Sequence, residues 1–204
     1  MKSQLHWEKI YTEKAQDEVS WYAAHLSTSL AFIQRTQVSK NAAIIDVGGG
    51  ESTLVDDLLS LGYQNLTVLD ISTAAIEASK KRLGEAGNRV HWITADITSI
   101  FLEPLAYDLW HDRAVFHFLT SPAGRAAYIK QVLRAVRPGG HIIVSTFGPE
   151  GPERCSGLEV IRYDADALHS EFGRRFSLQE SSTVLHETPF GTTQQFLYCY
   201  CMLE

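Results

Sequence analysis

The sequence predicts an α/β fold with one mostly parallel sheet, and three observations lead to that prediction. Short apolar segments of β-type composition alternate with helical segments over residues 43–146, an order typical of βαβ units. Three consecutive glycines at residues 48–50 follow the first apolar segment, where a strand can turn sharply into a helix. Residues 176–184 and 193–202 are two β-type segments with no helical pattern between them, so we expect an antiparallel hairpin at the sheet edge.

The composition suits a single globular domain. The chain has 204 residues, of which 45% are hydrophobic and 21% are charged, enough for one full-sized core. We expect one domain over residues 1–204, in which residues 1–40 form an N-terminal helical cover and residues 41–204 form the α/β core. The sequence carries no indication of the oligomeric state.

The charge distribution argues against nucleic-acid and membrane partners. The formal net charge is -6 and no block of consecutive basic residues occurs, so the electrostatic footprint for a nucleic acid is missing. No apolar run approaches the length of a membrane span. The three cysteines, Cys155, Cys199 and Cys201, cannot all pair, which fits a reducing compartment. We therefore expect a soluble, cytoplasmic protein.

Hydrophobic periodicity and turn residues predict seven strands and several helices. The strands are expected at residues 43–47, 67–69, 89–95, 107–111, 141–146, 176–184 and 193–202. Helices are expected at residues 54–59, 73–83, 122–136 and 164–172, and residues 7–36 also have a helical, aromatic pattern. Residues 147–163 are rich in glycine and proline and are predicted to form a loop above the strand ends, where substrate contacts are common.

The glycine turn is the first candidate binding feature. Asp46 ends the first strand, and Gly48, Gly49 and Gly50 follow it directly. Glycines let the backbone approach a ligand with no Cβ in the way, and the start of the next helix offers free N–H groups. The turn therefore predicts a nucleotide site, in preference to a tight turn without a ligand.

Carboxylates end the next two strands. Asp70 lies 20 residues beyond Gly50, where a nucleotide-binding α/β fold places an acid to accept the ribose hydroxyl protons. Asp96 and Ile97 follow the third strand, and an acid beside a flat apolar side chain can accept from an exocyclic amine and pack on its ring. Adenine fits this pair.

Four polar residues cluster after the fourth strand. His111, Asp112, Arg113 and His117 follow one another within seven residues, at the carboxyl end of a buried strand where ligands of open α/β sheets bind. Their chemistry suits proton transfer or recognition of an anionic group. The alternative is a buried network in which Arg113 pairs with Asp112 and His117 is hydrogen-bonded in the core.

Four motifs, in this order, resemble those of the class I S-adenosylmethionine-dependent methyltransferases. They are DVGGGES, VLDIS, TADI and RAVRPGGHIIVSTF. The closing hairpin also resembles that family, and the resemblance covers residues 43–200. It implies a Rossmann-like fold with a seven-stranded sheet and helices on both faces, S-adenosylmethionine as cofactor and S-adenosylhomocysteine as product.

The resemblance also implies roles for individual residues. Asp46, Gly48 and Gly50 would line the methionine portion, with Gly49 at the variable position between the two glycines. Asp70 and Ile71 would hold the ribose, and Asp96 and Ile97 the adenine. Asp112 and Arg113 would border both the methionine end and the acceptor. Trp21, beside Tyr22, resembles part of the N-terminal cover of small members, including relatives of protein lysine methyltransferases.

The acceptor we expect is a small molecule, such as a thiol, a sulfide or a compact acid held by Arg113. His111, Asp112, Arg113 and His117 are the expected catalytic residues, and no metal is expected. A protein lysine is the alternative acceptor, and a cofactor-binding module without transfer activity is a further one. A dehydrogenase is disfavoured because Thr53 stands at the third glycine of its fingerprint.

Overall fold

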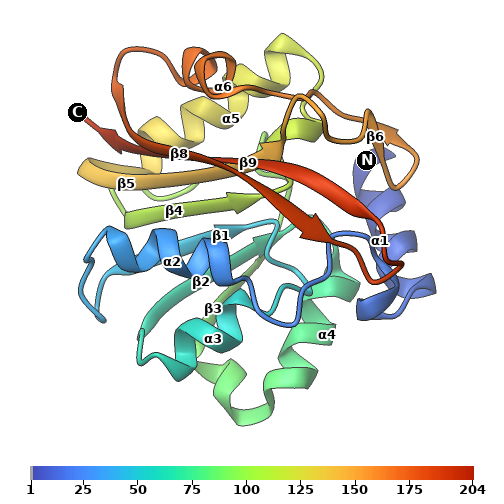
Figure 1. Cartoon of the computed structure of the whole chain (residues 1–204). Coiled ribbons are helices and arrows are strands. Elements are labelled where there is room, and N and C mark those ends of the chain that lie inside the picture. Colours follow the sequence, from blue (N-terminus) through green and yellow to red (C-terminus); the bar gives the residue numbers. More distant parts are fainter. Residues whose placement is uncertain (1) are drawn as a thin grey trace.

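A seven-stranded sheet runs through the centre of the protein (Figure 1). The computed structural model describes residues 2–204. The strand order is β3-β2-β1-β4-β5-β9-β8, and a separate two-stranded sheet joins β6 to β7. The strands are β1 (Ala43–Val47), β2 (Asn65–Asp70), β3 (Val90–Thr94), β4 (Tyr107–Arg113), β5 (Val136–Phe147), β6 (Arg154–Cys155), β7 (Leu158–Glu159), β8 (Phe176–Glu187) and β9 (Thr193–Leu203).

Helices cover both faces of the large sheet. They are α1 (Lys2–Glu13), α2 (Ser27–Arg35), α3 (Leu54–Ser60), α4 (Thr73–Leu83), α5 (Pro122–Ala135) and α6 (Ala165–Phe172), with 3-10 turns at η1 (Gln16–Glu18), η2 (Gly84–Arg89) and η3 (Phe116–Phe118). One core, which includes Tyr128 and Leu168, packs under α5 and α6. The other, which includes Phe32 and Leu58, packs under α2 and α3. Figure 1 shows the two layers on opposite sides of the sheet, with α1 at the end toward which β4 points.

The strand pairing confirms the fold that the sequence predicts. β1 pairs in parallel with both β2 and β4, and β4 pairs in parallel with β5. β9 pairs antiparallel with β5 and with β8, so the C-terminal hairpin closes the sheet edge. The chain leaves β1 toward β2 on one side and later returns to β4 on the other. Ligands of open α/β sheets bind in the crevice that such a switch creates.

Three local predictions need correction. The helical pattern over residues 7–36 is interrupted, because residues 19–26 cross between α1 and α2 as non-helical chain. Carbonyls of this segment accept hydrogen bonds from the side chains of Arg113, His186 and Thr53 instead of from helical N–H groups. The fifth strand begins earlier, at Val136, which pairs with Tyr107; residues 137–140 then bulge from the strand before the pairing resumes at Leu109 and His141. The expected loop over residues 147–163 contains the small β6–β7 hairpin.

Within residues 2–204, every helix falls short of the length and apolar character that a membrane span requires.

Candidate active site

Two adjoining cavities lie at the carboxyl ends of the parallel strands. The larger measures about 360 Å³, and six predicted cofactor residues line it: Trp21, Gly48, Asp70, Ile71, Asp96 and Ile97. The smaller measures about 40 Å³, and its lining includes Asp46 and Gly49. Gly48 and Arg113 lie on the boundary and belong to both. The structure therefore brings together residues from the ends of β1, β2, β3 and β4.

The glycine turn has no room for side chains. Gly48 has a φ of +72°, and a Cβ added there would lie 2.0 Å from Cγ2 of Val115 on the cavity wall. A Cβ on Gly50 would lie 2.6 Å from Oδ2 of Asp70. Gly50 lines neither cavity, and instead its N–H donates to Asp70 Oδ2 at 3.0 Å. Its contribution is to fix the orientation of the Asp70 carboxylate.

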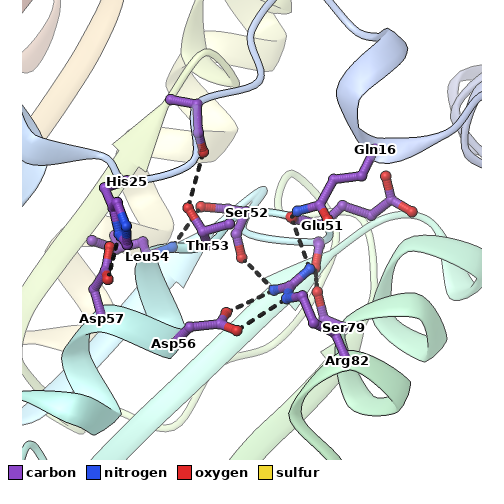
Figure 2. Close-up of polar contacts among 12 residues, drawn as sticks. Gln16, His25, Glu51, Ser52, Thr53, Leu54, Asp56, Asp57, Ser79 and Arg82 are labelled. Atoms are coloured by element: carbon purple, nitrogen blue, oxygen red, sulfur yellow. Dashed lines mark hydrogen bonds and ion pairs between the residues drawn. The ribbon is translucent and has the colours of Figure 1, made fainter.

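The loop after the glycines is held in place from two sides (Figure 2). The Arg82 guanidinium, on α4, donates to the carbonyls of Glu51 at 3.2 Å and Ser52 at 2.8 Å, and it pairs with Asp56. On the other side, the Thr53 hydroxyl donates to the carbonyl of Ala23 at 3.1 Å. The cavity floor is thus tied both to α4 and to the segment that crosses above the strand ends.

Asp70 is a buried carboxylate that faces the larger cavity. Its Oδ1 accepts from the N–H of Ser72 at 2.8 Å, and its Oδ2 accepts from Gly50. Burial raises the pKa of Asp70 to about 6, and the two N–H donors partly oppose that rise. Each carboxylate oxygen keeps a lone pair for a further donor, such as a ribose hydroxyl.

Asp96, just beyond the neighbouring strand β3, also lines the larger cavity. Its Oδ1 accepts from the backbone N–H of Thr98 at 2.8 Å and from the Thr98 hydroxyl at 2.6 Å. These bonds fix the carboxylate and leave Oδ2 for a ligand. Ile97 is buried beside it and presents an apolar surface to the same cavity. The pair can therefore accept from an amine and pack against a flat ring.

The smaller cavity contains two carboxylate oxygens without partners. Oδ2 of Asp46 and Oε2 of Glu51 are both buried, and neither has a hydrogen-bond partner within residues 2–204. Burial raises the pKa of the Glu51 carboxyl, and nearby Arg82 opposes that rise. A ligand with a positively charged amine would supply partners for both oxygens.

The residues at the end of β4 divide between the two faces of the sheet. His111 and Arg113 point to the side of α2: His111 bonds to Asp46 and to Ser29 of α2, and the Arg113 guanidinium donates to the Trp21 carbonyl at 2.9 Å. Asp112 points to the side of α5 and accepts from the hydroxyl of Tyr128 at 2.6 Å. Side chains alternate across a strand, so neighbours in sequence are separated here.

Asp112 lines neither cavity. Besides Tyr128, it accepts from the N–H groups of Val115 at 2.9 Å and Phe116 at 3.2 Å, so its carboxylate holds the turn after β4. Burial raises its pKa to about 7. The structure therefore corrects the expectation that Asp112 faces the cofactor and the acceptor.

His117 also lies outside both cavities. It is buried among aromatic rings, and its Nδ1 accepts from the N–H of Phe147 at 3.2 Å. Burial, together with the charge of Arg113, lowers the pKa of His117 to about 3. Of the four expected catalytic residues, Arg113 alone lines the larger cavity, His111 lines the smaller one, and the other two lie in the core.

An aromatic roof, formed by Trp7, Tyr11, Trp21 and Phe118, covers the larger cavity. The Trp7 ring packs edge-on against Trp21 at 5.8 Å and against Phe118 at 4.9 Å between centroids. Glu8, on the same helix as Trp7, accepts hydrogen bonds from the Ser72 hydroxyl at 2.8 Å and the Ala74 N–H at 3.1 Å. The carboxylate thus binds the start of α4, where a helix favours negative charge.

Sequence reasoning did not single out several of these residues. Glu8 and Arg82 act through contacts 66 and 30 residues away in the chain, which no local pattern reveals. Phe118 lies just beyond the predicted cluster and could have been included as a neighbour of His117. Cys155, on β6, lines the larger cavity, and burial raises its pKa to about 11, which keeps the thiol protonated near neutral pH.

In the part of the chain that the structure describes, no three histidine, cysteine, aspartate or glutamate side chains come together as a metal site requires.

Residues 44–140 match the family model described as "Methyltransferase domain". The chain is 35% identical over 157 residues to malonyl-[acyl-carrier protein] O-methyltransferase of Anoxybacillus flavithermus, a match that covers 76% of this chain and 53% of the relative. It is 21% identical over 138 residues to eEF1A lysine and N-terminal methyltransferase of Mus musculus, covering 68% of this chain and 19% of the relative. The chain thus spans about half or less of the length of these two relatives.

A solved structure gives a match over nearly the whole chain. It is Burkholderia thailandensis 1,6-didemethyltoxoflavin-N1-methyltransferase with bound 1,6-didemethyltoxoflavin and S-adenosylhomocysteine. The TM-score is 0.68 at 18% identity, and the match covers 99% of this chain and 84% of the other. At this identity, the match establishes a shared fold.

Proposed function

We propose that this chain is a class I S-adenosylmethionine-dependent methyltransferase, as the match of residues 44–140 to the methyltransferase family model supports, and that it methylates a small-molecule acceptor held beneath its aromatic roof. When bound, S-adenosylmethionine supplies a methyl group on a positively charged sulfur, which an in-line nucleophile can displace. The protein's task is to align the acceptor and exclude water.

The larger cavity fits the adenosine portion of the cofactor. Asp70 would accept the ribose hydroxyl protons, with Ile71 beside it on the cavity wall. Asp96 would accept from the adenine amine through its free Oδ2, and Ile97 would pack against the ring. The missing side chain at Gly48 lets Val115 pack directly against the turn, and both residues line this cavity.

The smaller cavity fits the amino-acid portion. The buried, unpartnered oxygens of Asp46 and Glu51 would accept from its ammonium group. Burying these oxygens without a donor would be costly, so a charged donor at this point is favourable. Gly49 lies directly over Asp46, where a Cβ would approach Oδ2 to 2.3 Å, so a side chain at this position would displace the carboxylate.

The aromatic roof is the observation that carries the choice of acceptor. Trp7, Tyr11 and Trp21 close the cavity above the cofactor residues. The acidic residues that line the larger cavity in the described chain, Asp70 and Asp96, are assigned to the adenosine portion. A protein lysine would call for an open acidic groove, whereas this mostly apolar space lined by aromatic rings suits a compact molecule.

The polar groups near the roof favour an acceptor that needs no general base. Arg113 is the charged side chain on the boundary between the two cavities, while Asp112 and His117 lie in the core. A guanidinium stabilises an anion and does not remove a proton. A carboxylic acid is an anion near neutral pH, and a thiol with a pKa of about 8.5 is partly ionised there. These are therefore the acceptors we propose.

A protein lysine acceptor is the second candidate. Its support is the similarity to eEF1A lysine and N-terminal methyltransferase, although this chain spans 19% of that protein. Malonyl-[acyl-carrier protein] O-methyltransferase, whose name describes a carboxyl-type acceptor, is the more identical of the two relatives.

The test is the release of S-adenosylhomocysteine from S-adenosylmethionine with a panel of small thiols, sulfide, carboxylic acids and amines, beside a lysine-rich protein extract. We expect turnover with a small anionic acceptor, and we expect Arg113→Gln to lower it at least tenfold, the scale of a lost charge-assisted hydrogen bond. Arg137→Gln is the matched control, because Arg137 pairs with Asp108 outside both cavities. Labelling of a protein band would overturn the proposed acceptor class, and cofactor binding without any turnover would indicate a binding module.

A further inference from the structure

A buried line of hydrogen bonds runs from the smaller cavity into the core. It begins at Asp46 on β1, whose Oδ1 lies 2.7 Å from Nδ1 of His111 on β4. Nε2 of His111 lies 2.9 Å from the hydroxyl of Ser29 on α2, and that hydroxyl lies 3.2 Å from the hydroxyl of Tyr198 on β9. All four residues are buried, with exposures between 0% and 4%.

The chemistry of the groups gives the first bond of the line a direction. An ionised carboxylate only accepts, so His111 donates from Nδ1 to Asp46. Nε2 of His111 faces the Ser29 hydroxyl, which in turn faces the Tyr198 hydroxyl, and each hydroxyl can either donate or accept. Both ring nitrogens of His111 therefore have a partner, which fixes the orientation of the ring.

One atom at the end of the line has no partner. Oδ2 of Asp46 is buried and makes no hydrogen bond to any residue from 2 to 204, although Asp46 lines the smaller cavity. Because His111 holds Oδ1, the carboxylate cannot turn to satisfy its second oxygen within the core. The network thus keeps one unsatisfied, buried acceptor on a residue that lines the smaller cavity.

From this arrangement we infer that His111, backed by Ser29 and Tyr198, is a positioning residue that aims the Asp46 carboxylate at the ammonium group of the cofactor's amino-acid portion. The inference rests on the proposed function and replaces the expected catalytic role of His111. Residue 111 lines the smaller cavity and not the larger one, so it acts on the cofactor side and not on the acceptor.

Two ligands separate this role from a merely structural one. S-adenosylhomocysteine carries the amino-acid portion, whereas methylthioadenosine has the same adenosine and sulfur without it. His111→Phe keeps a ring of similar shape but removes both hydrogen bonds. We expect this variant to bind S-adenosylhomocysteine about tenfold more weakly, the scale of one buried hydrogen bond, and to bind methylthioadenosine within about twofold of the unchanged protein.

Further variants test each link in the line. His111→Asn places an amide N–H near the position of Nδ1 and should recover part of the lost affinity. Ser29→Ala and Tyr198→Phe should weaken S-adenosylhomocysteine binding by smaller factors. In the Asp46→Asn background, His111→Phe should cause little further loss, because the two residues act through one carboxylate.

His141→Phe is the matched control. His141 lies on the neighbouring strand β5, and its Nδ1 lies 2.8 Å from the hydroxyl of Tyr200 on β9, but it lines neither cofactor cavity. It should leave the binding of both ligands unchanged.

Isothermal titration calorimetry with both ligands distinguishes the outcomes. An equal loss for the two ligands in His111→Phe, or no loss for either, would overturn the inference while leaving the proposed function intact. Failure of the unchanged protein to bind S-adenosylhomocysteine would overturn the proposed function and the inference with it. If His111→Phe does not fold, the affinities for the two ligands are compared in Ser29→Ala and His111→Asn instead. An equal loss of affinity for both ligands in these variants would overturn the inference.

Discussion

At the scale of single residues, burial sets the acid–base behaviour of this site more than pairing of charges does. Asp70 and Asp112 both have pKa values above the usual range for an aspartate, and His117 has one well below the usual range for a histidine. In each case the largest cause is the loss of water around the charged form. Of these three residues, Asp70 lines the larger cavity. Its protonation should therefore change the affinity for the proposed cofactor.

Asp70 should make the affinity for S-adenosylhomocysteine depend on pH. Under the proposed function a ribose hydroxyl would donate to the ionised carboxylate, and the pKa of about 6 means that Asp70 becomes protonated as the pH falls below that value. We therefore expect the affinity to be constant above about pH 7 and to decline as the pH falls through 6, by up to about tenfold per pH unit. Calorimetric titrations between pH 5 and 8 measure this.

Asp70→Asn is the variant that identifies the group. It should bind the ligand more weakly at pH 8, by about 1–3 kcal/mol, the scale of buried polar groups left without partners. It should also lose the decline near pH 6. Asp108→Asn, at a residue that lines neither cofactor cavity, should retain it. A decline of the same size in Asp70→Asn would show that another group titrates.

At the scale of elements, helix α1 is held over the cofactor site by one carboxylate and an aromatic contact. Glu8 binds the N-terminus of α4, and its partner Ser72 also donates its N–H to Asp70. The roof and the Asp70 carboxylate are therefore connected through a single residue, Ser72. Opening of this contact would therefore loosen the roof over a ligand bound beneath α1.

We predict that Glu8→Ala accelerates the release of S-adenosylhomocysteine. The carboxylate stabilises the docked helix by roughly 1 kcal/mol, the range for a charge at a helix terminus, so the dissociation rate should rise about fivefold. Stopped-flow tryptophan fluorescence can follow it, because Trp7 and Trp21 lie in the roof. Glu13→Ala is the control, because Glu13 lies on the same helix and pairs with Lys9 at the surface. Equal release rates in the two variants would contradict the prediction.

At the scale of the whole molecule, the stability is linked to pH through a carboxylate in the core under α5. Asp112 is buried against Tyr128 and has a pKa of about 7, raised chiefly by burial. An acid with a raised pKa in the folded state contributes stability below its unfolded pKa near 4, where it is neutral in both states. That contribution is lost as the pH rises through 7. Asp70 acts in the same direction between about pH 4 and 6.

Asp112→Asn should flatten this dependence. An asparagine stays neutral, so the free energy of unfolding of the variant relative to the unchanged protein should rise between pH 4 and 8, by about 2–4 kcal/mol if most of the pKa shift is realised. The variant loses part of the hydrogen bonding to Val115 and Phe116 and should be the less stable protein at pH 4. Urea unfolding at several pH values checks the trend, and parallel curves for the two proteins would refute it.

Much of the fold and half of the site follow from local patterns. The glycine turn, Asp70 and Asp96 could be recognised because each lies at a strand end that periodicity and turn chemistry define. The parallel strands bring these ends to one edge of the sheet, so their grouping needs no further information. The hairpin of β8 and β9 follows in the same way from two strand patterns separated by a turn.

Other features depend on which parts of the chain meet in three dimensions. His111, Asp112 and Arg113 form one cluster in the sequence, but the alternation of side chains along β4 sends Asp112 to the opposite face of the sheet. The alternation reaches Asp112 and Arg113 because β4 continues to residue 113, where its pairing with β5 ends. The prediction stopped the strand at residue 111, so that alternation could not be applied to the residues beyond it.

The amino-acid sequence thus specifies the order of elements, the glycine turn and the acids at the strand ends, because these depend on neighbouring residues and on short periodicities. It does not specify that Glu8 reaches α4, that Ser29 and Tyr198 meet at His111, or that His117 is deprived of water. Those facts arise when distant segments pack together, since burial and hydrogen-bond partners are properties of the folded chain and are not recorded in any local stretch of it.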